Sequence, residues 1–321
     1  MLSFGRWWGR AQTPVLGVDI GAGGVHVVEL ARARPLRIAH YAHRTLPQGA
    51  IRDGAIMLRE AVCDALGDAV RDSGSRLRHA ALGLPAGAVI KKTLTLPQGL
   101  SEEELEMHVE SEADASLPFA RDEIGLDFEV VGTGASQSDG IDVMLVAARK
   151  EKIDERTLLA EAAGLRPLIV DVESHALMSA VALFEAGCAA SAPTPQLIAI
   201  LQLDPDRSHC LFMQDGVLLY ERELGSVLLR NEAAAIEAIC QEFRRAFQLF
   251  QTATTFSELH KVYVTGSAPP DLPDAIAERM RVQVTLPDPL HHWSNGTVHE
   301  SGMHPSACML ACGLALRSFD S

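Results

Sequence analysis

Two turns that each carry an aspartate have the composition expected around a bound phosphate. Residues 18–24 (VDIGAGG) join two apolar segments, and their three glycines let the backbone approach a ligand and direct N–H groups at an anion. Asp19 in this turn can hold a metal-bound water beside the phosphate. The second turn, residues 204–208 (DPDRS), is poor in glycine. Glycine hairpins are common, so a purely structural first turn is an equal alternative.

A third turn, residues 264–268 (VTGSA), closes a predicted strand before a predicted helix. This context suits a ligand that approaches a helix N-terminus. The first turn differs from the dinucleotide-binding fingerprint, because a strand and not a helix follows its glycines. Each of the three turns is a weak signal by itself.

Hydrophobic periodicity predicts the strands and helices that position these turns. Strands are predicted at 15–20, 25–30, 37–46, 79–85, 89–97, 124–131, 141–149, 167–172, 196–203 and 261–266. Helices are predicted at 56–74, 101–117, 152–165, 173–187, 231–255 and 306–317. A capping box, Ser101 with Glu104, opens the second helix, and a hairpin is predicted around Asp215 and Gly216.

The two halves of the chain repeat one pattern. Each opens with an apolar strand, an aspartate turn and a return strand, and Asp204 follows Asp19 by 185 residues. Helices and further strands follow in both halves. Two such halves would enclose a cleft, which is a common place for a ligand.

Composition excludes several classes of function. The 321 residues include 28 basic and 42 acidic side chains, for a net charge of −14, and only 5% are aromatic. Neither duplex binding nor stacking on single-stranded nucleic acid fits this balance. No apolar run approaches the roughly 18 residues that span a bilayer, and the first residues lack the apolar core of a secretory signal. The length predicts about two domains, and we expect a cytoplasmic location.

The six cysteines are scattered and form no C-x-x-C motif. In a cytosolic setting we expect them to be small buried hydrophobes and not a disulfide framework. Cys308 and Cys312 would share one helix face. Core packing is favoured there over a two-ligand metal clip.

Taken together, the D-I-G turn, the second aspartate turn and the T-G-S turn resemble the phosphate-1, phosphate-2 and adenosine motifs of the actin/Hsp70/FtsA superfamily. Further segments are similar to the PilM family of type IV pilus assembly proteins: 17–30, 89–131, 142–154, 164–177, 242–250 and 313–317. The resemblance covers almost the whole chain from about residue 14. It implies an α/β fold of two actin-like, ribonuclease H-like domains with an FtsA- and PilM-type inserted subdomain.

The resemblance also implies a division of the chain. A flexible basic and aromatic tail would occupy 1–13. Actin-like domain I would span 14–194, with the inserted subdomain at about 86–150. Actin-like domain II would span 195–321, with a helical subdomain at about 226–259.

By the same resemblance, the cleft would bind ATP or ADP with magnesium. The residues carried over are Asp19, Gly21, Ala22, Gly23, Gly24, His26, Asp204, Asp206, Ser208, Arg245, Gly266 and Ser267. Asp19 and Asp204 would hold magnesium through water. Asp171 and Glu173 are candidates for orienting the attacking water. We favour the alternative of a strand-end aspartate and a helix-start glutamate stabilised by the helix dipole.

The phosphate loops depart from the family pattern. Ala22, Gly23 and Gly24 replace the serines that commonly follow the first glycine, and His26 stands where a phosphate-facing lysine is usual. Histidine is mostly neutral at pH 7, so a fixed positive charge is lost. Pro205 removes an N–H donor from the second turn. We therefore expect nucleotide binding to be weak or lost, and little or no turnover.

An acidic block occupies residues 101–129, with eleven Asp and Glu against one Arg. Such a block is either a solvated face or a docking surface. In the PilM family the partner is the short cytoplasmic N-terminus of PilN, an apolar peptide with basic residues that binds in a groove beside the inserted subdomain. Complementary charge would steer that encounter. Lys91 and Lys92 are expected at exposed positions of an alternating strand.

The resemblance thus implies an assembly protein at the cytoplasmic face of the inner membrane of a Gram-negative-type bacterium. It would contact PilN and other pilus assembly proteins, bind no nucleic acid, and reach the membrane only through partners; a homodimer or filament stays open. Three alternatives remain: an active ATPase or sugar kinase of the superfamily, an FtsA-like filament former, and a secretion-system scaffold.

Two minor features have structural alternatives that we favour. The N-terminal Phe4, Trp7 and Trp8 could rest on a membrane surface, but a disordered tail is favoured. Four histidines within fourteen residues match no ordered metal-ligand spacing, and a structural or accidental cluster is favoured over a metal site: His291, His292, His299 and His304.

Overall fold

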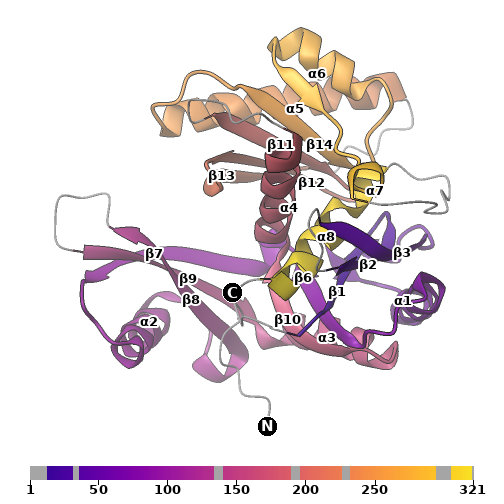
Figure 1. Ribbon diagram of the computed structural model, residues 1–321. Helices are drawn as coiled ribbons and strands as arrows, with labels where there is room; N and C mark the ends of the chain where they lie inside the picture. Colours follow the sequence, from indigo (N-terminus) through magenta and orange to yellow (C-terminus); the bar gives the residue numbers. More distant parts are fainter. Residues whose placement is uncertain are drawn as a thin grey trace.

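Two five-stranded sheets with the same topology form the centre of the protein. This computed structural model describes residues 13–31, 36–133, 140–188, 196–225, 232–293 and 305–319 (Figure 1). The first sheet has the order β10-β6-β1-β2-β3 and the second has the order β13-β12-β11-β14-β15. In each, three antiparallel strands are followed by parallel ones. This repeated order confirms the predicted actin-like, ribonuclease H-like duplication.

The strands of the first sheet are β1 (Leu16–Gly21), β2 (Gly24–Ala31), β3 (Arg37–Arg44), β6 (His79–Leu84) and β10 (Arg166–Val172). Those of the second are β11 (Leu197–Leu203), β12 (Ser208–Gln214), β13 (Val217–Leu224), β14 (Lys261–Gly266) and β15 (Gln283–Thr285). The aspartate turns connect β1 to β2 and β11 to β12. Both turns therefore stand at the same place in their sheets.

Two helices pack between the sheets, α4 (Glu173–Cys188) and α8 (Met309–Leu316). The α8 helix is apolar on every face, and Cys308 and Cys312 lie buried in this core, as predicted. A Cβ at Gly313 would lie 1.9 Å from the carbonyl oxygen of Ala176. The close contact of the two helices thus requires glycine at this position.

The other helices cover the outer faces. Helices α1 (Arg59–Ser73) and α3 (Lys150–Ala162) lie against the first sheet, where their apolar residues form a second core. Helices α5 (Glu232–Ala253) and α6 (Leu272–Met280) lie against the second sheet. The ring of Phe212 stacks there with those of Phe243 and Phe250. Two smaller elements also lie outside the inserted subdomain: the short helix α7 (Pro289–His292) and a hairpin of β4 (Ile51–Arg52) and β5 (Ala55–Ile56).

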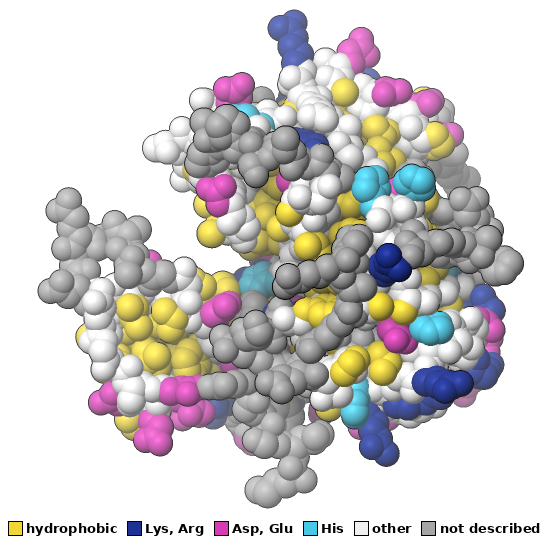
Figure 2. All heavy atoms as spheres, in the orientation of Figure 1, with side chains coloured by type: hydrophobic (Ala, Val, Ile, Leu, Met, Phe, Trp, Pro, Cys, Tyr) yellow, Lys and Arg dark blue, Asp and Glu magenta, His cyan; other side chains and the backbone are white. Residues whose placement is uncertain are grey.

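The inserted subdomain is a three-stranded sheet with one helix, and it projects from the body of the protein (Figure 1). Its strands, in the order β7-β9-β8, are β7 (Val89–Pro97), β8 (Ile124–Thr133) and β9 (Gly140–Arg149), and α2 (Glu102–Ser116) packs on them through its own apolar core. The predicted capping box between Ser101 and Glu104 is present at the start of α2. Figure 2 shows hydrophobic side chains gathered over the strands and acidic ones along the edge beside them.

Some predictions fall outside the described residues. These are the tail at 1–12, the segment 226–231, and His299 and His304 of the histidine cluster. Among the described residues, no helix is long and apolar enough to cross a membrane.

Candidate functional site

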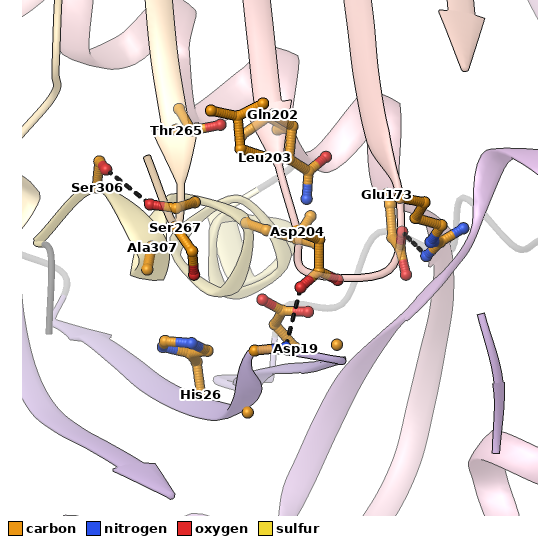
Figure 3. A pocket seen from close by; sticks show the side chains of 17 residues that line it. Asp19, His26, Glu173, Gln202, Leu203, Asp204, Thr265, Ser267, Ser306 and Ala307 are labelled. Carbon is orange, nitrogen blue, oxygen red and sulfur yellow. Dashed lines mark hydrogen bonds and ion pairs between the residues drawn. The ribbon is translucent and has the colours of Figure 1, made fainter. Parts of the chain in front are cut away.

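A small cavity lies where the two halves meet, and both aspartate turns face it (Figure 3). Asp19 comes from β1, Asp204 follows β11, and Glu173 is the first residue of α4. The remaining lining residues are Gly21, Gly23, Gly24, His26, Leu177, Gln202, Leu203, Arg207, Thr265, Gly266, Ser267, Ser306, Ala307 and Leu310. The cavity volume is about 30 Å³, which is room for about two water molecules. We call this cavity the cleft.

The carboxylate of Asp204 is hydrogen-bonded to the first turn. The backbone N–H of Gly23 donates to Oδ1 (2.9 Å) and that of Ala22 donates to Oδ2 (3.2 Å). A Cβ at Gly21 would lie 2.7 Å from Oδ2, so glycine is needed for this approach. Burial, followed by the charge of Asp206, raises the pKa of Asp204 to about 6. The side chain is therefore mainly ionised at pH 7.5.

Buried arginines neutralise part of the acidic charge around the cleft. Nη2 of Arg207 lies 3.0 Å from Oε2 of Glu173, and both side chains are at most 10% exposed. Arg156 donates to the carbonyl oxygens of Ile20 (2.9 Å) and Gly54 (3.2 Å). Burial, and then the charge of Glu173, raise the pKa of Asp19 well above its ordinary value.

His26 carries no positive charge toward the cleft. His26 lies opposite Asp19 in the antiparallel pairing of β1 with β2, and the centre of its ring lies 4.6 Å from the centre of the His43 ring. Burial, and then His43, lower the pKa of His26 to about 3. The imidazole is therefore neutral at pH 7 and cannot replace a lysine that faces phosphate.

The third turn closes tightly on the end of β11. Gly266 has a φ of +82°, and a Cβ there would lie 2.0 Å from the carbonyl oxygen of Leu203. The N–H of Ser267 donates to that same oxygen (2.8 Å), and Oγ of Ser306 donates to the carbonyl oxygen of Gly266 (3.3 Å). Only glycine fits this combination of conformation and contact.

A larger cavity, which we call the groove, lies between the inserted subdomain, α3 and the second half. Its volume is about 510 Å³, within the usual range for ligand pockets. Apolar residues dominate its walls: Ala55, Leu84, Pro85, Ala88, Ile90, Phe119, Ile124, Ala147 and Ala148. The charged lining residues are Asp53, Arg149, Lys152, Glu155, Arg156, Arg207 and Glu223. Arg207 thus lines both the groove and the cleft.

Comparison with known proteins decides the family. The sequence model of a family described as "Type IV pilus assembly protein PilM" matches residues 17–229 and 233–319. The chain belongs to the PilM family.

Solved structures share its fold. A chain of a PilM-PilN type IV pilus biogenesis complex is 22% identical, with 97% of this chain and 100% of that chain covered and a TM-score of 0.76. The ethanolamine utilization protein EutJ from Carboxydothermus hydrogenoformans is 11% identical, with 95% and 90% covered and a TM-score of 0.50. These neighbours agree with the actin-like fold that the strand order shows.

In this PilM-family chain, most of the residues expected to bind nucleotide meet at the cleft. Those that line it are Asp19, Gly21, Gly23, Gly24, His26, Asp204, Gly266 and Ser267, and Ala22 contributes its N–H. Asp206 instead accepts a hydrogen bond from the N–H of Gly54 (3.2 Å), and Ser208 is buried at the start of β12. Arg245 lies on α5 away from the cleft, where its side chain is 65% exposed and 3.9 Å from Glu242.

Asp171 lies near the end of β10 and Glu173 begins α4, as the favoured interpretation expected. Glu173 is more than a helix-start residue, because it lines the cleft and forms a buried ion pair with Arg207. Asp171 is buried outside the cleft lining, with Oδ2 3.4 Å from Nε of Arg317. The structure therefore separates the two candidates for orienting water.

The prediction for Lys91 is wrong. Its side chain is only 15% exposed, and Nζ lies 3.0 Å from Oε1 of Glu221 and 2.9 Å from Oγ of Ser174. The inserted subdomain packs against the second half here, so a face that alternation predicted as exposed is covered. Lys92 pairs with Glu112 of α2.

Sequence reasoning missed Arg156 and Arg207, although Arg207 stands inside the second turn. The sequence does show Arg207 close to Asp204 and Asp206, but it does not show that this arginine is buried. Among the residues that the structure describes, no group of three or more His, Cys, Asp or Glu could hold a metal ion. Of the two carboxylates expected to hold magnesium, Asp19 and Asp204, that of Asp204 is engaged by the first turn, and the third carboxylate of the cleft, Glu173, is paired with Arg207.

Proposed function

We propose that this PilM-family protein is an assembly adaptor that holds a short cytoplasmic segment of a PilN-like membrane protein in the groove. The observation that carries the proposal is the groove itself, about 510 Å³ of mainly apolar space beside the inserted subdomain. A related chain of 22% identity was solved as a PilM-PilN complex, which supports this partner. The adaptor would then reach the cytoplasmic face of the inner membrane through its partner.

The walls of the groove suit an apolar peptide with basic residues. Ile90 is partly exposed there, and the guanidinium carbon of Arg149 lies 5.4 Å from the ring centre of Phe119. Each large apolar side chain that the peptide buries contributes about 1.5–3 kcal/mol. Glu155 and Glu223 can pair with basic side chains of the peptide.

We further propose that the cleft is structural and supports little or no hydrolysis. The N–H groups that would hold a phosphate already bind Asp204, His26 is neutral, and the cleft has room for about two waters. Glu173 is held by Arg207, which disfavours a role as a general base. ATP or ADP, with or without magnesium, must displace Asp204 to enter. This arrangement disfavours the alternative of an active ATPase or sugar kinase.

Peptide binding tests the adaptor role. A fluorescent synthetic peptide of a PilN N-terminus is titrated with the wild-type chain and with Ile90→Glu, which places a charge in the groove. The matched control is Thr93→Glu, on the same strand but outside the groove lining. Ile90→Glu should weaken binding at least about tenfold, because an apolar contact is lost and a charge is buried. Thr93→Glu should bind as wild type does.

Circular dichroism checks that wild type and Ile90→Glu are both folded. If both are folded and bind the peptide with equal affinity, docking in the groove is contradicted. A phosphate-release assay runs beside the titration. Sustained phosphate release that Asp19→Ala abolishes would favour the alternative of an active ATPase. Sedimentation of the protein in the presence of ATP would favour the alternative of an FtsA-like filament former.

A further inference from the structure

We propose that the carboxylate of Asp204 acts as a built-in anion that occupies the anion site of the first turn and clasps the two halves together without any ligand. Its two oxygens accept hydrogen bonds from the successive N–H groups of Ala22 (3.2 Å) and Gly23 (2.9 Å), which belong to the other half. Successive N–H groups in a glycine-rich turn form a concavity that binds anions. Hydrogen bonds to an ionised carboxylate are about twice as strong as neutral ones.

The rest of the second turn holds Asp204 in this position. The N–H of Asp204 donates to the carbonyl oxygen of Arg207 (3.0 Å), which closes the turn. Asp206 accepts from the N–H of Gly54 (3.2 Å), and Arg207 pairs with Glu173 (3.0 Å). Three side chains of one short turn therefore bind the first half.

The neighbouring glycines fit the clasp as well. A Cβ at Gly21 would lie 2.7 Å from Oδ2 of Asp204, and one at Gly23 would lie 3.3 Å from Oδ1 and 3.5 Å from Cδ of Pro205. The cleft that remains has a volume of about 30 Å³. A phosphate ligand and the Asp204 carboxylate therefore compete for the same N–H groups.

This role is opposite to the one that the superfamily pattern implies, in which the second-turn aspartate helps a metal to hold phosphate. If Asp204 is a clasp, removing its charge should free the first turn and improve anion binding without a metal. If it is only a metal-positioning residue, removing its charge should leave the ligand-free first turn unchanged. The proposal does not depend on peptide docking.

Hydrogen exchange at the amides of Ala22 and Gly23 tests the clasp at pH 8, where Asp204 is ionised. The variants are Asp204→Asn, nearly isosteric and neutral, and the control Asp215→Asn at an exposed hairpin turn. In ligand-free wild type the two amides should be protected. Asp204→Asn should speed their exchange about tenfold or more, and Asp215→Asn should leave it unchanged.

Binding of inorganic tripolyphosphate in EDTA is the second readout. Asp204→Asn should bind it at least about tenfold more tightly than wild type. Unchanged exchange together with unchanged or weaker tripolyphosphate binding would overturn the proposal. If Asp204→Asn does not fold, hydrogen exchange at Ala22 and Gly23 in the wild-type chain decides the question. Protection of these two amides supports the clasp, and exchange as fast as in an open loop refutes it.

Discussion

Replacing Arg207 by methionine should lower the free energy of unfolding by about 3–5 kcal/mol. The ion pair with Glu173 has an N–O distance of 3.0 Å, and the two side chains are 9% and 10% exposed. At an effective dielectric constant of about 20, the attraction at this distance is about 5 kcal/mol. Methionine keeps most of the side-chain volume but removes the charge. Glu173 then stays buried beside Asp19 and Asp204 without its partner.

Urea unfolding followed by circular dichroism measures this change. The double variant Glu173→Gln/Arg207→Met removes both charges, so it should recover most of the loss and end within about 1 kcal/mol of wild type. The matched control is Arg245→Met. That arginine is 65% exposed and 3.9 Å from Glu242, so its removal should cost less than about 0.5 kcal/mol. The pair joins the two halves, so a second probe of unfolding checks whether the single variant still unfolds in one transition.

Two results would refute this reasoning. A loss below about 1 kcal/mol in Arg207→Met would mean that water or nearby groups already solvate Glu173. A double variant as unstable as the single one would mean that Arg207 stabilises by packing and not by its charge.

Two further predictions concern other buried positions. The pKa of His26 is about 3 against an ordinary 6.5, so the unfolded chain takes up its proton first; stability is lost as pH falls below 6.5, by about 2 kcal/mol at pH 5. Urea unfolding at pH 7.5 and at pH 5 measures this loss of unfolding free energy, and His26→Asn should remove it. A loss of the same size in His26→Asn would contradict its assignment to His26. Gly313→Ala should lower stability by at least about 2 kcal/mol, because its Cβ would lie 1.9 Å from the carbonyl oxygen of Ala176. Calorimetry should show no such loss for Gly187→Ala, whose Cβ meets nothing within 4 Å; equal melting temperatures for the two variants would contradict the packing argument.

Local features of the fold could be read from the sequence. The strands at Val89–Pro97 and Lys261–Gly266 have the predicted bounds, because alternation or a bounded β-branched run is visible in any window of that length. The capping box at Ser101 is likewise a local signal. The hairpin of Ile51–Arg52 and Ala55–Ile56 was not predicted, since two-residue strands carry no periodicity.

The polar contacts of the site could not be read in the same way. Asp204 and Gly23 are 181 residues apart in the chain, and Lys91 and Glu221 are 130 apart. Periodicity gives the face of an element but not what covers that face, so Lys91 was predicted as exposed. Arg245 lies in a helix, as periodicity predicted for residues 231–255. The buried Phe243, Ala246 and Phe250 of α5 turn that arginine away from the cleft, and the helical spacing of those residues was available in the sequence.

The second turn joins the cleft to the groove. Asp204 contacts the first turn, and Arg207, which closes the same turn through a backbone hydrogen bond of 3.0 Å, lines both cavities. A ligand that shifts the backbone of this turn would also shift Arg207 in the groove wall, and no hydrolysis is needed for that movement. The coupling between the two sites is limited by how differently each ligand binds the clasped and open states, and it is reciprocal. A peptide that tightens when tripolyphosphate binds must, by the same factor, tighten tripolyphosphate, and two titrations with the order of ligands reversed would have to agree.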